Sequence, residues 1–245
     1  MPVLLVTRPE PDAIDTALRL EALGIETIRA PMLEMKPLDT PLPDPAGLGA
    51  LVLTSANAIR ALAQNGKLAA YLALPVFTVG ERTAAAAREA GFADVRSADG
   101  TVDDLAAKIV AAAPDGAILY PAAYHLSADL AGQLAPHGLD VQTFRVYDML
   151  AAQRLPDDVA NRLAEGTIDG VVFYSRRTAE TFCHLVSAAG LTEKSRRTIT
   201  ALCLSENVAE VPFEAGFVRV ALAEYPSAEA MEALALSFAR GQIGP

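Results

Sequence analysis

Two apolar stretches of this sequence end in hydroxyl residues and then continue as sequence typical of a helix. The first, ALVLTSANAIRALA (residues 50–63), places Thr54 and Ser55 at the turn, and the second, GVVFYSRRTAETF (170–182), places Ser175 there. A hydroxyl residue at such a turn caps the helix by accepting a hydrogen bond from one of its first backbone amides. The same amides also bind anions, because the positive end of the helix dipole lies beside them. The pattern therefore predicts helix caps, anion contacts, or both, at two separate places in the chain.

Four arginines also lie at or beside the expected starts of helices: Arg8, Arg82, Arg176 and Arg177. The helix dipole disfavours a cation at this end of a helix. Because a guanidinium group binds a carboxylate through two parallel hydrogen bonds, these arginines favour a ligand rich in carboxylates. The alternative is a set of solvated surface charges. Tyr147, at the end of an expected strand, is either a satisfied buried phenol or a proton donor.

Several common site motifs do not occur in the sequence. No GxGxxG follows a strand and GxxxxGK[ST] is absent, so no motif predicts a nucleotide site. The histidines (His125, His137 and His184) lack the spacing of metal ligands. Neither Ser55 nor Ser175 has the GxSxG context of a serine nucleophile.

The candidate residues follow apolar strands that alternate with helical sequence. The expected strands are 3–6, 25–29, 51–53, 76–79, 117–120, 141–146, 171–174 and 199–203, and the expected helices include 11–23, 82–90, 101–112 and 126–136. This alternation predicts an α/β protein with mostly parallel sheets. In such sheets the ligand site lies beyond the carboxyl ends of the strands, which is where the hydroxyl residues and arginines occur.

The order of these elements repeats along the chain. EAGFADV (89–95) and EAGFVRV (214–220) stand at nearly the same separation as Ser55 and Ser175, which indicates a duplicated α/β unit. A Pro-rich segment (31–47) and a later one (146–158) separate the repeats. Sequence alone allows two consecutive halves, or an interrupted arrangement in which the chain crosses twice between two domains.

The bulk composition excludes some classes of partner. Thirty acidic and twenty basic residues give a net charge of −10, so we expect no binding to duplex nucleic acid. No apolar run approaches the roughly 18 residues of a membrane span, and the N-terminus lacks the basic region of a signal peptide.

Cys183 and Cys203 are expected to be free thiols, and the expected location is the cytoplasm.

Taken in order, several segments resemble the uroporphyrinogen-III synthase family over essentially the whole chain. They are LLVTRP (4–9), GIETIRAPMLEM (24–35), LVLTSANAIRAL (51–62), VFTVGERTAAAAREAG (76–91), FRVY (144–147) and VVFYSRRTAETF (171–182). The resemblance implies an α/β fold of two flavodoxin-like domains, each with a parallel sheet in three layers, joined by a two-stranded antiparallel linker. It implies a discontinuous domain 1 (1–34 plus 152–245), a domain 2 (38–147) and linkers at about 32–38 and 146–152.

The resemblance also implies a monomeric, cofactor-free and metal-free lyase of tetrapyrrole biosynthesis. Family members cyclise the linear tetrapyrrole hydroxymethylbilane with loss of water and inversion of ring D, giving uroporphyrinogen III. The implied partners are this small-molecule substrate and, transiently, the preceding enzyme of the pathway. The two domains of the family present their strand ends to one cleft. Loss of the hydroxyl gives a cationic azafulvene and then a spiro intermediate.

Carried onto this sequence, the resemblance makes Tyr147 the candidate general acid. The candidate substrate-binding residues are Arg8, Thr54, Ser55, Gly80, Thr83, Ser175, Arg176 and Ser205. Two departures stand out: SENVA (205–209) has Val208 where the family usually has Thr, and PAAYHLSADL (121–130) replaces an Arg/Gly-type turn. Val208 favours one alternative, a non-catalytic bilobed protein that binds a carboxylate-rich ligand. A tandem receiver-like regulator is disfavoured, because the strand ends carry Arg and hydroxyl residues rather than clustered acids.

Overall fold

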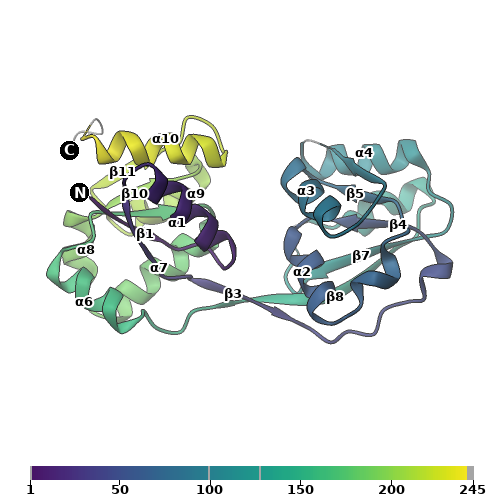
Figure 1. Cartoon of the computed structure of the whole chain (residues 1–245), viewed down its shortest axis with the longest axis horizontal. Helices are drawn as coiled ribbons and strands as arrows, with labels where there is room; N and C mark the ends of the chain where they lie inside the picture. The colour runs from purple at the N-terminus through teal and green to yellow at the C-terminus, as the bar shows by residue number, and fades with distance from the viewer. Residues whose placement is uncertain (1, 99, 127, 242–245) are drawn as a thin grey trace. The chain divides into compact units, whose positions relative to one another are not determined.

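The computed structural model describes residues 2–98, 100–126 and 128–241 and contains two parallel-stranded sheets (Figure 1). The chain forms two compact units, one of residues 1–34 and 150–245 (unit 1) and one of residues 35–149 (unit 2). None of the helices within the described ranges is long and apolar enough to cross a membrane.

The sheet of unit 1 is parallel, with strand order β11-β10-β9-β1-β2. Its strands are β1 (Val3–Val6), β2 (Glu26–Arg29), β9 (Gly170–Phe173), β10 (Thr200–Cys203) and β11 (Arg219–Leu222). Its helices are α1 (Asp12–Ala22), α6 (Asp157–Glu165), α7 (Arg176–Ala188), α8 (Thr192–Thr198), α9 (Glu206–Glu214) and α10 (Ala228–Ala239). Strands and helices alternate as the sequence predicts, except that α8 follows α7 directly.

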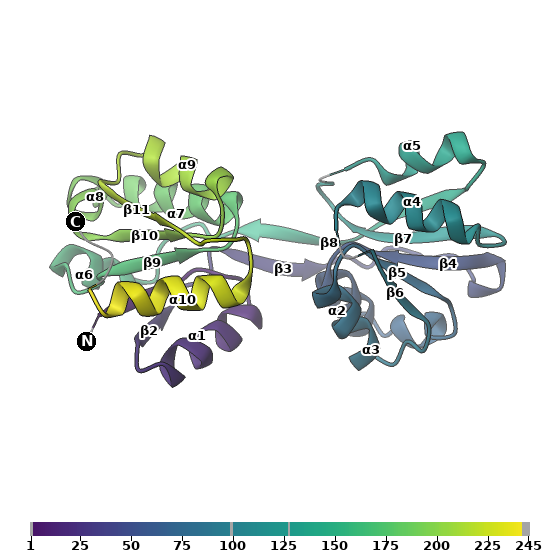
Figure 2. The same ribbon diagram turned by 90° about the horizontal axis from the view of Figure 1, so that it is seen from above.

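Both faces of this sheet are covered, because successive residues of a strand point to opposite sides. Leu4 and Val6 of β1 belong to the core that includes α1 and α10, whereas Leu5 belongs to the core that includes α6, α7 and α9. Figure 2 shows α1 and α10 on one side of the sheet and α7 and α9 on the other. The unit therefore has three layers, and its central strands are apolar on both faces.

The sheet of unit 2 has the order β3-β8-β7-β4-β5-β6. Its strands are β3 (Leu33–Pro37), β4 (Leu48–Leu53), β5 (Val76–Thr78), β6 (Val95–Ser97), β7 (Ala117–Ala123) and β8 (Val141–Ala151). Its helices are α2 (Ala56–Gln64), α3 (Glu81–Glu89), α4 (Val102–Ala112) and α5 (Leu130–Leu134), with short 3-10 turns at Pro45–Gly47, Leu68–Tyr71 and Ala135–His137. Residues of α2 and α3 pack on one face, and residues of α4 and α5 pack on the other (Figure 2).

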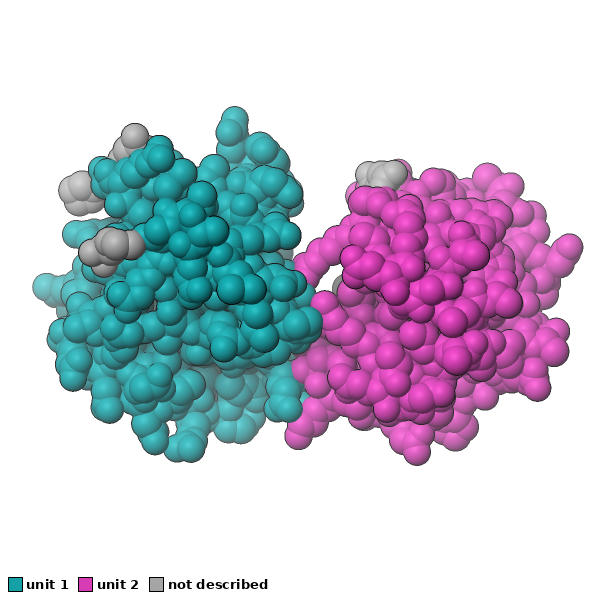
Figure 3. Space-filling model, viewed as in Figure 1, with its two compact units in different colours: residues 1–34, 150–245 teal, residues 35–149 magenta. Residues whose placement is uncertain are grey.

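The chain passes from unit 1 to unit 2 within β3 and returns within β8 (Figure 3 colours the two units). These two strands run antiparallel, since the amide of Leu38 donates to the carbonyl of Val146 (2.8 Å) and that of Ala152 donates to the carbonyl of Met32 (3.0 Å). The remaining pairs of both sheets are parallel. The predicted fold class is therefore confirmed.

The structure differs from the expected elements around residue 121. The strand expected at 117–120 continues through Pro121 to Ala123, the helix expected at 126–136 is reduced to α5, and the strand expected at 141–146 runs to Ala151. Proline is tolerated because β4 pairs with β7 only as far as Leu119. The amide of Ile118 faces β8, so position 121 faces the β4 side, where the pairing with β4 has already ended and no donor is needed.

Candidate active site

A cavity of about 340 Å³ lies at the carboxyl ends of the central strands of unit 2. Its lining residues are Thr54, Ser55, Val79, Val102, Tyr120, Ala123, His125, Leu126 and Tyr147. Ligand sites of open parallel sheets lie at this edge. The structure thus brings together three of the candidate residues, Thr54, Ser55 and Tyr147, and adds a second phenol and an imidazole.

Tyr147 comes from β8 and is 6% exposed, with its ring packed in the core formed with α2 and α3. Burial raises the pKa of its phenol above the usual value, while interaction with the Ser55 hydroxyl acts in the opposite direction and Tyr120 adds a smaller raising effect. Desolvation has this sign because it penalises the charged phenolate. The phenol therefore keeps its proton at neutral pH, which is the state a general acid requires.

Ser55 caps helix α2. Its backbone is extended (φ −153°, ψ 143°) and its Oγ accepts a hydrogen bond from the amide of Asn57 at 3.2 Å. The Asn57 side chain also reaches the sulfur of Met149, a residue of β8, with an Nδ2–Sδ distance of 3.5 Å. Ser55 therefore both caps α2 and interacts with the phenol of Tyr147.

Ser175 occupies the same local structure at the start of α7 in unit 1. Its backbone angles (φ −151°, ψ 150°) match those of Ser55, and its Oγ accepts from the amide of Thr178 at 3.2 Å. The hydroxyls of Ser175 and Thr178 are 2.6 Å apart. The two strand-hydroxyl-helix turns of the sequence are thus two equivalent N-caps, one in each unit.

Gly80 and Thr83 begin helix α3 but are not among the residues that line this cavity. The carbonyl of Gly80, the N-cap residue, accepts hydrogen bonds from the amides of Thr83 and Ala84, both at 3.1 Å. Thr83 is buried. Ser205 in unit 1 holds the corresponding N-cap position of α9 without a side-chain capping bond, and Val208 lies buried in the core beneath it.

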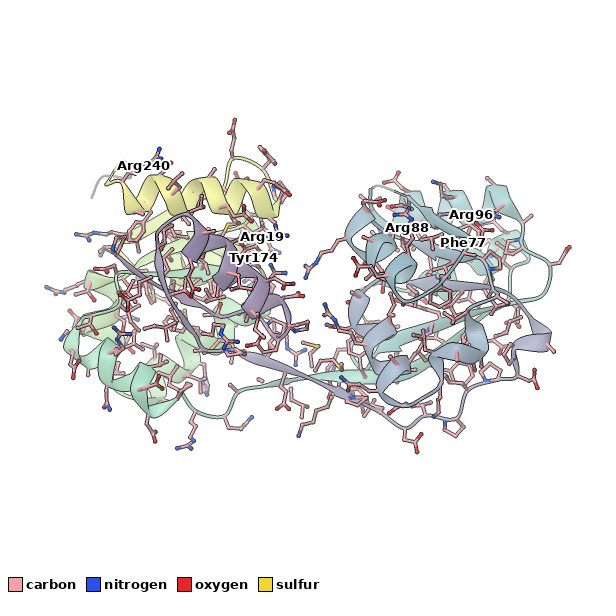
Figure 4. The ribbon with its side chains drawn as sticks, viewed as in Figure 1. Arg19, Phe77, Arg88, Arg96, Tyr174 and Arg240 are labelled. Atoms are coloured by element: carbon pink, nitrogen blue, oxygen red, sulfur yellow. The ribbon has the colours of Figure 1, made fainter. Side chains whose placement is uncertain are left out.

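Arg8 is held by groups of unit 1. Its guanidinium donates to Asp12 at 3.0 Å and to Thr16 at 3.1 Å, and its Cζ lies 4.2 Å from the ring centroid of Tyr174, which is labelled in Figure 4. Only 9% of Arg8 is exposed. These contacts join the end of β1 both to α1 and to Tyr174, the residue that follows β9.

Arg176 is also engaged within unit 1. Its guanidinium forms ion pairs with Glu180 at 3.0 Å and Glu210 at 2.6 Å, and it donates to the backbone carbonyl of Asn207. Two acidic side chains therefore already neutralise an arginine for which the sequence suggests an anionic ligand. The contacts join α7 to α9.

Within the described ranges, no group of three or more His, Cys, Asp or Glu side chains is placed to hold a metal ion. Cys183 and Cys203 are free thiols. Burial raises the pKa of Cys183 to about 11 and that of Cys203 to about 12, so both thiols are protonated at neutral pH.

A family model described as uroporphyrinogen-III synthase HemD matches residues 14–233. The chain belongs to the uroporphyrinogen-III synthase family. Members of this family are cyclising lyases of haem biosynthesis, so the chain is assigned to this class of enzyme. No curated protein sequence matches it significantly.

Solved structures with uroporphyrinogen-III synthase names share its fold. The uroporphyrinogen-III synthetase of Helicobacter pylori 26695 is 23% identical with a TM-score of 0.66, over 97% of this chain and 100% of that chain. A mutant uroporphyrinogen III synthase of the extremely thermophilic bacterium Thermus thermophilus is 19% identical with a TM-score of 0.57, over 99% of each chain. At these identities the likeness bears on the fold alone.

Sequence reasoning misses two polar residues of the cavity, Tyr120 and His125. Tyr120 follows three apolar strand residues, so the sequence predicts it as the last strand position, with the site beginning at Pro121. Because β7 continues to Ala123, the Tyr120 side chain lies beside Thr54, with 3.1 Å between the two hydroxyl oxygens. A phenol this close to a strand end is the available signal. For His125 the available signal is its place in PAAYHLSADL (121–130), the turn that follows this strand.

Proposed function

We propose that this chain cyclises hydroxymethylbilane to uroporphyrinogen III with Tyr147 as the proton donor. The observation that carries the proposal is the placement of Tyr147 with Thr54 and Ser55 around one strand-end cavity, in a chain of the uroporphyrinogen-III synthase family. A buried and protonated phenol beside a cavity suits the acid-assisted loss of a hydroxyl group.

The proposed first step breaks the C–O bond of the hydroxymethyl group. The Tyr147 phenol gives its proton to the hydroxyl oxygen, water leaves, and the electron pair of the O–H bond stays on the phenolate. The substituted carbon of ring D then attacks the cationic azafulvene and gives the spiro intermediate. The original bond between that carbon and its methylene bridge breaks, and the bridge carbon forms a new bond to the unsubstituted α carbon of ring D, which inverts the ring. The proton that ring D loses at the end of the sequence returns to the phenolate, so the net change is loss of one water.

The substrate's carboxylates need partners at the same edge of the sheet. We propose that the backbone amides at the start of α2, beside Ser55, and of α3, beside Gly80 and Thr83, supply some of them, since helix N-termini bind anions. Substrate contacts remain predictions for four residues of unit 1: Arg8, Ser175, Arg176 and Ser205. A cytoplasmic location and a transient contact with the preceding enzyme also stay predictions.

Closure of the chain without inversion occurs spontaneously and gives the I isomer, so the enzyme's contribution is to hold the chain ends in one geometry. The test is to mix purified protein with freshly prepared hydroxymethylbilane, without added metal or nucleotide, and to separate the oxidised products. We expect the III isomer in excess over a protein-free control. Formation of the I isomer alone, at the rate of that control, would contradict the proposal and favour the binding-protein alternative.

A further inference from the structure

Two neighbouring hydroxyl residues that follow β4 each contact the phenol of a different tyrosine. Thr54 lies 3.1 Å from the hydroxyl of Tyr120, and Ser55 interacts with the phenol of Tyr147. Tyr120 comes from β7 and packs with α4 and α5, whereas Tyr147 comes from β8 and packs with α2 and α3. The rings thus enter from opposite faces of the sheet, and both line the one cavity.

A departing hydroxyl group has two hydrogen-bonding needs, because it carries one O–H donor and an oxygen that accepts. Tyr147 can satisfy the oxygen by donating its proton. The substrate's own O–H then needs an acceptor in a site where an unpaired polar group would be costly. When Tyr120 donates its hydrogen to Thr54, the lone pairs of its oxygen are left to accept.

We infer that Tyr120 is a second catalytic residue of the dehydration step, an inference that rests on the function proposed above. Its phenol oxygen accepts the hydrogen bond of the substrate's hydroxymethyl O–H and so turns the hydroxyl oxygen toward Tyr147. Thr54 is a positioning residue that fixes the orientation of the Tyr120 hydroxyl. No bond to Tyr120 forms or breaks: the proton moves from Tyr147, and the departing water keeps the hydrogen bond to Tyr120.

The pair also gives a reason for selectivity toward a bilane that ends in a hydroxymethyl group. A bilane that ends in a methyl group has neither the donor nor the acceptor, and its binding does not involve Tyr120 through this contact. Such an analogue therefore separates the proposed contact from a general effect of Tyr120 on the shape of the cavity.

The test compares Tyr120→Phe with Tyr71→Phe, a matched control in the same unit. Tyr71 is buried and donates its hydroxyl to the carbonyl of Pro43 at 2.7 Å, but it does not line the cavity. We expect Tyr120→Phe to lower kcat about tenfold, equivalent to about 1.4 kcal/mol, with KM within about twofold. Tyr71→Phe should retain the wild-type kcat. The inhibition constant of the methyl-terminated analogue should be the same for wild type and Tyr120→Phe.

Variants of Thr54 test the positioning role. Thr54→Val should lower kcat and leave little further effect of Tyr120→Phe in the double variant, whereas Thr54→Ser, which keeps a hydroxyl, should lose less than Thr54→Val. Wild-type kcat in Tyr120→Phe, or a matching loss of analogue binding, would overturn the inference. Either result would concern the role of Tyr120 alone, provided that the wild-type protein makes the III isomer. If the wild-type protein does not make the III isomer, the proposed function is itself wrong.

Discussion

Replacing Tyr147 by phenylalanine removes one oxygen atom from the cavity and leaves the aromatic ring in place. The ring is buried among apolar residues of the α2 and α3 face, so the variant keeps that packing. Ser55 loses its interaction with the phenol but still caps α2 through the amide of Asn57. We therefore expect a loss in unfolding free energy of about 0.5–1.5 kcal/mol, seen as a decrease of a few degrees in Tm.

The effect on turnover should be larger than the effect on stability. A positioned general acid contributes roughly 10²- to 10⁴-fold. We expect the lower end, about 10²-fold or ~2.7 kcal/mol, because the hydroxyl also leaves without the enzyme. As the catalysed reaction slows, spontaneous closure competes and the share of I isomer rises. The expected signature is thus a folded protein that yields mostly the wrong isomer.

The contribution of the Tyr147 phenol to kcat should be lost at high pH and retained at neutral pH. The acid acts in its protonated form, and burial raises its pKa above the ordinary value of about 10 for tyrosine. The phenol therefore stays protonated between about pH 6 and 9, and its contribution is lost only as the pH rises through the raised pKa. The ratio of wild-type to Tyr147→Phe kcat should be constant over that neutral range.

The assay measures initial rates and the ratio of III to I isomer from pH 6 to 9, with Tyr71→Phe as a control that removes a buried phenol outside the cavity. Unchanged kcat and isomer ratio in a folded Tyr147→Phe protein would refute its role as the acid. A ratio of rates that varied steeply within this pH range would refute the argument from burial.

Three further predictions follow from the geometry. Ser55→Ala and Ser175→Ala should each lower the unfolding free energy by about 1 kcal/mol, since each removes one N-cap bond. Only Ser55→Ala should also lower kcat and raise the share of I isomer as Tyr147→Phe does, whereas loss of a substrate contact in Ser175→Ala would appear in KM; equal losses of kcat would contradict this. Arg8→Ala should cost about 3 kcal/mol of stability, because it leaves the mostly buried carboxylate of Asp12 without its ion-pair partner. Urea denaturation measures this loss, and an unchanged midpoint would contradict it. The buried thiol of Cys203, with its pKa raised to about 12, should resist iodoacetamide at pH 8 until the protein is unfolded; rapid native labelling would contradict it.

Local patterns are enough to predict the fold class. Apolar strands alternate with helices throughout, and this order leads to parallel sheets covered on both faces. The expectation that Thr54 and Ser55 lie at a strand end follows from the same pattern, whereas Tyr147, expected at the end of a strand, lies within β8 because that strand continues to Ala151. Their meeting around one cavity depends on the sheet order, in which β7 and β8 follow β4, and no local pattern specifies that order.

The environment of the arginines is harder to predict. Arg8 has its ion-pair partner four residues later in the sequence, so the Arg8–Asp12 pair is visible in TRPEPD. The partner of Arg176 in α9, Glu210, is distant in sequence and is brought close only by the packing of α7 against α9. Tyr120 is missed for a different reason. A proline after an apolar run predicts the end of a strand, but β7 continues through Pro121 because its pairing with β4 ends at Leu119 and no donor is needed on that side.

A crystal structure with bound uroporphyrinogen III tests the account most directly. The methylene bridge formed from the hydroxymethyl carbon should lie in the unit 2 cavity, beside the phenol oxygens of Tyr147 and Tyr120. A macrocycle bound with that bridge away from both phenols, and with the cavity unoccupied by it, would contradict the assignment of this cavity as the place where the hydroxyl group leaves.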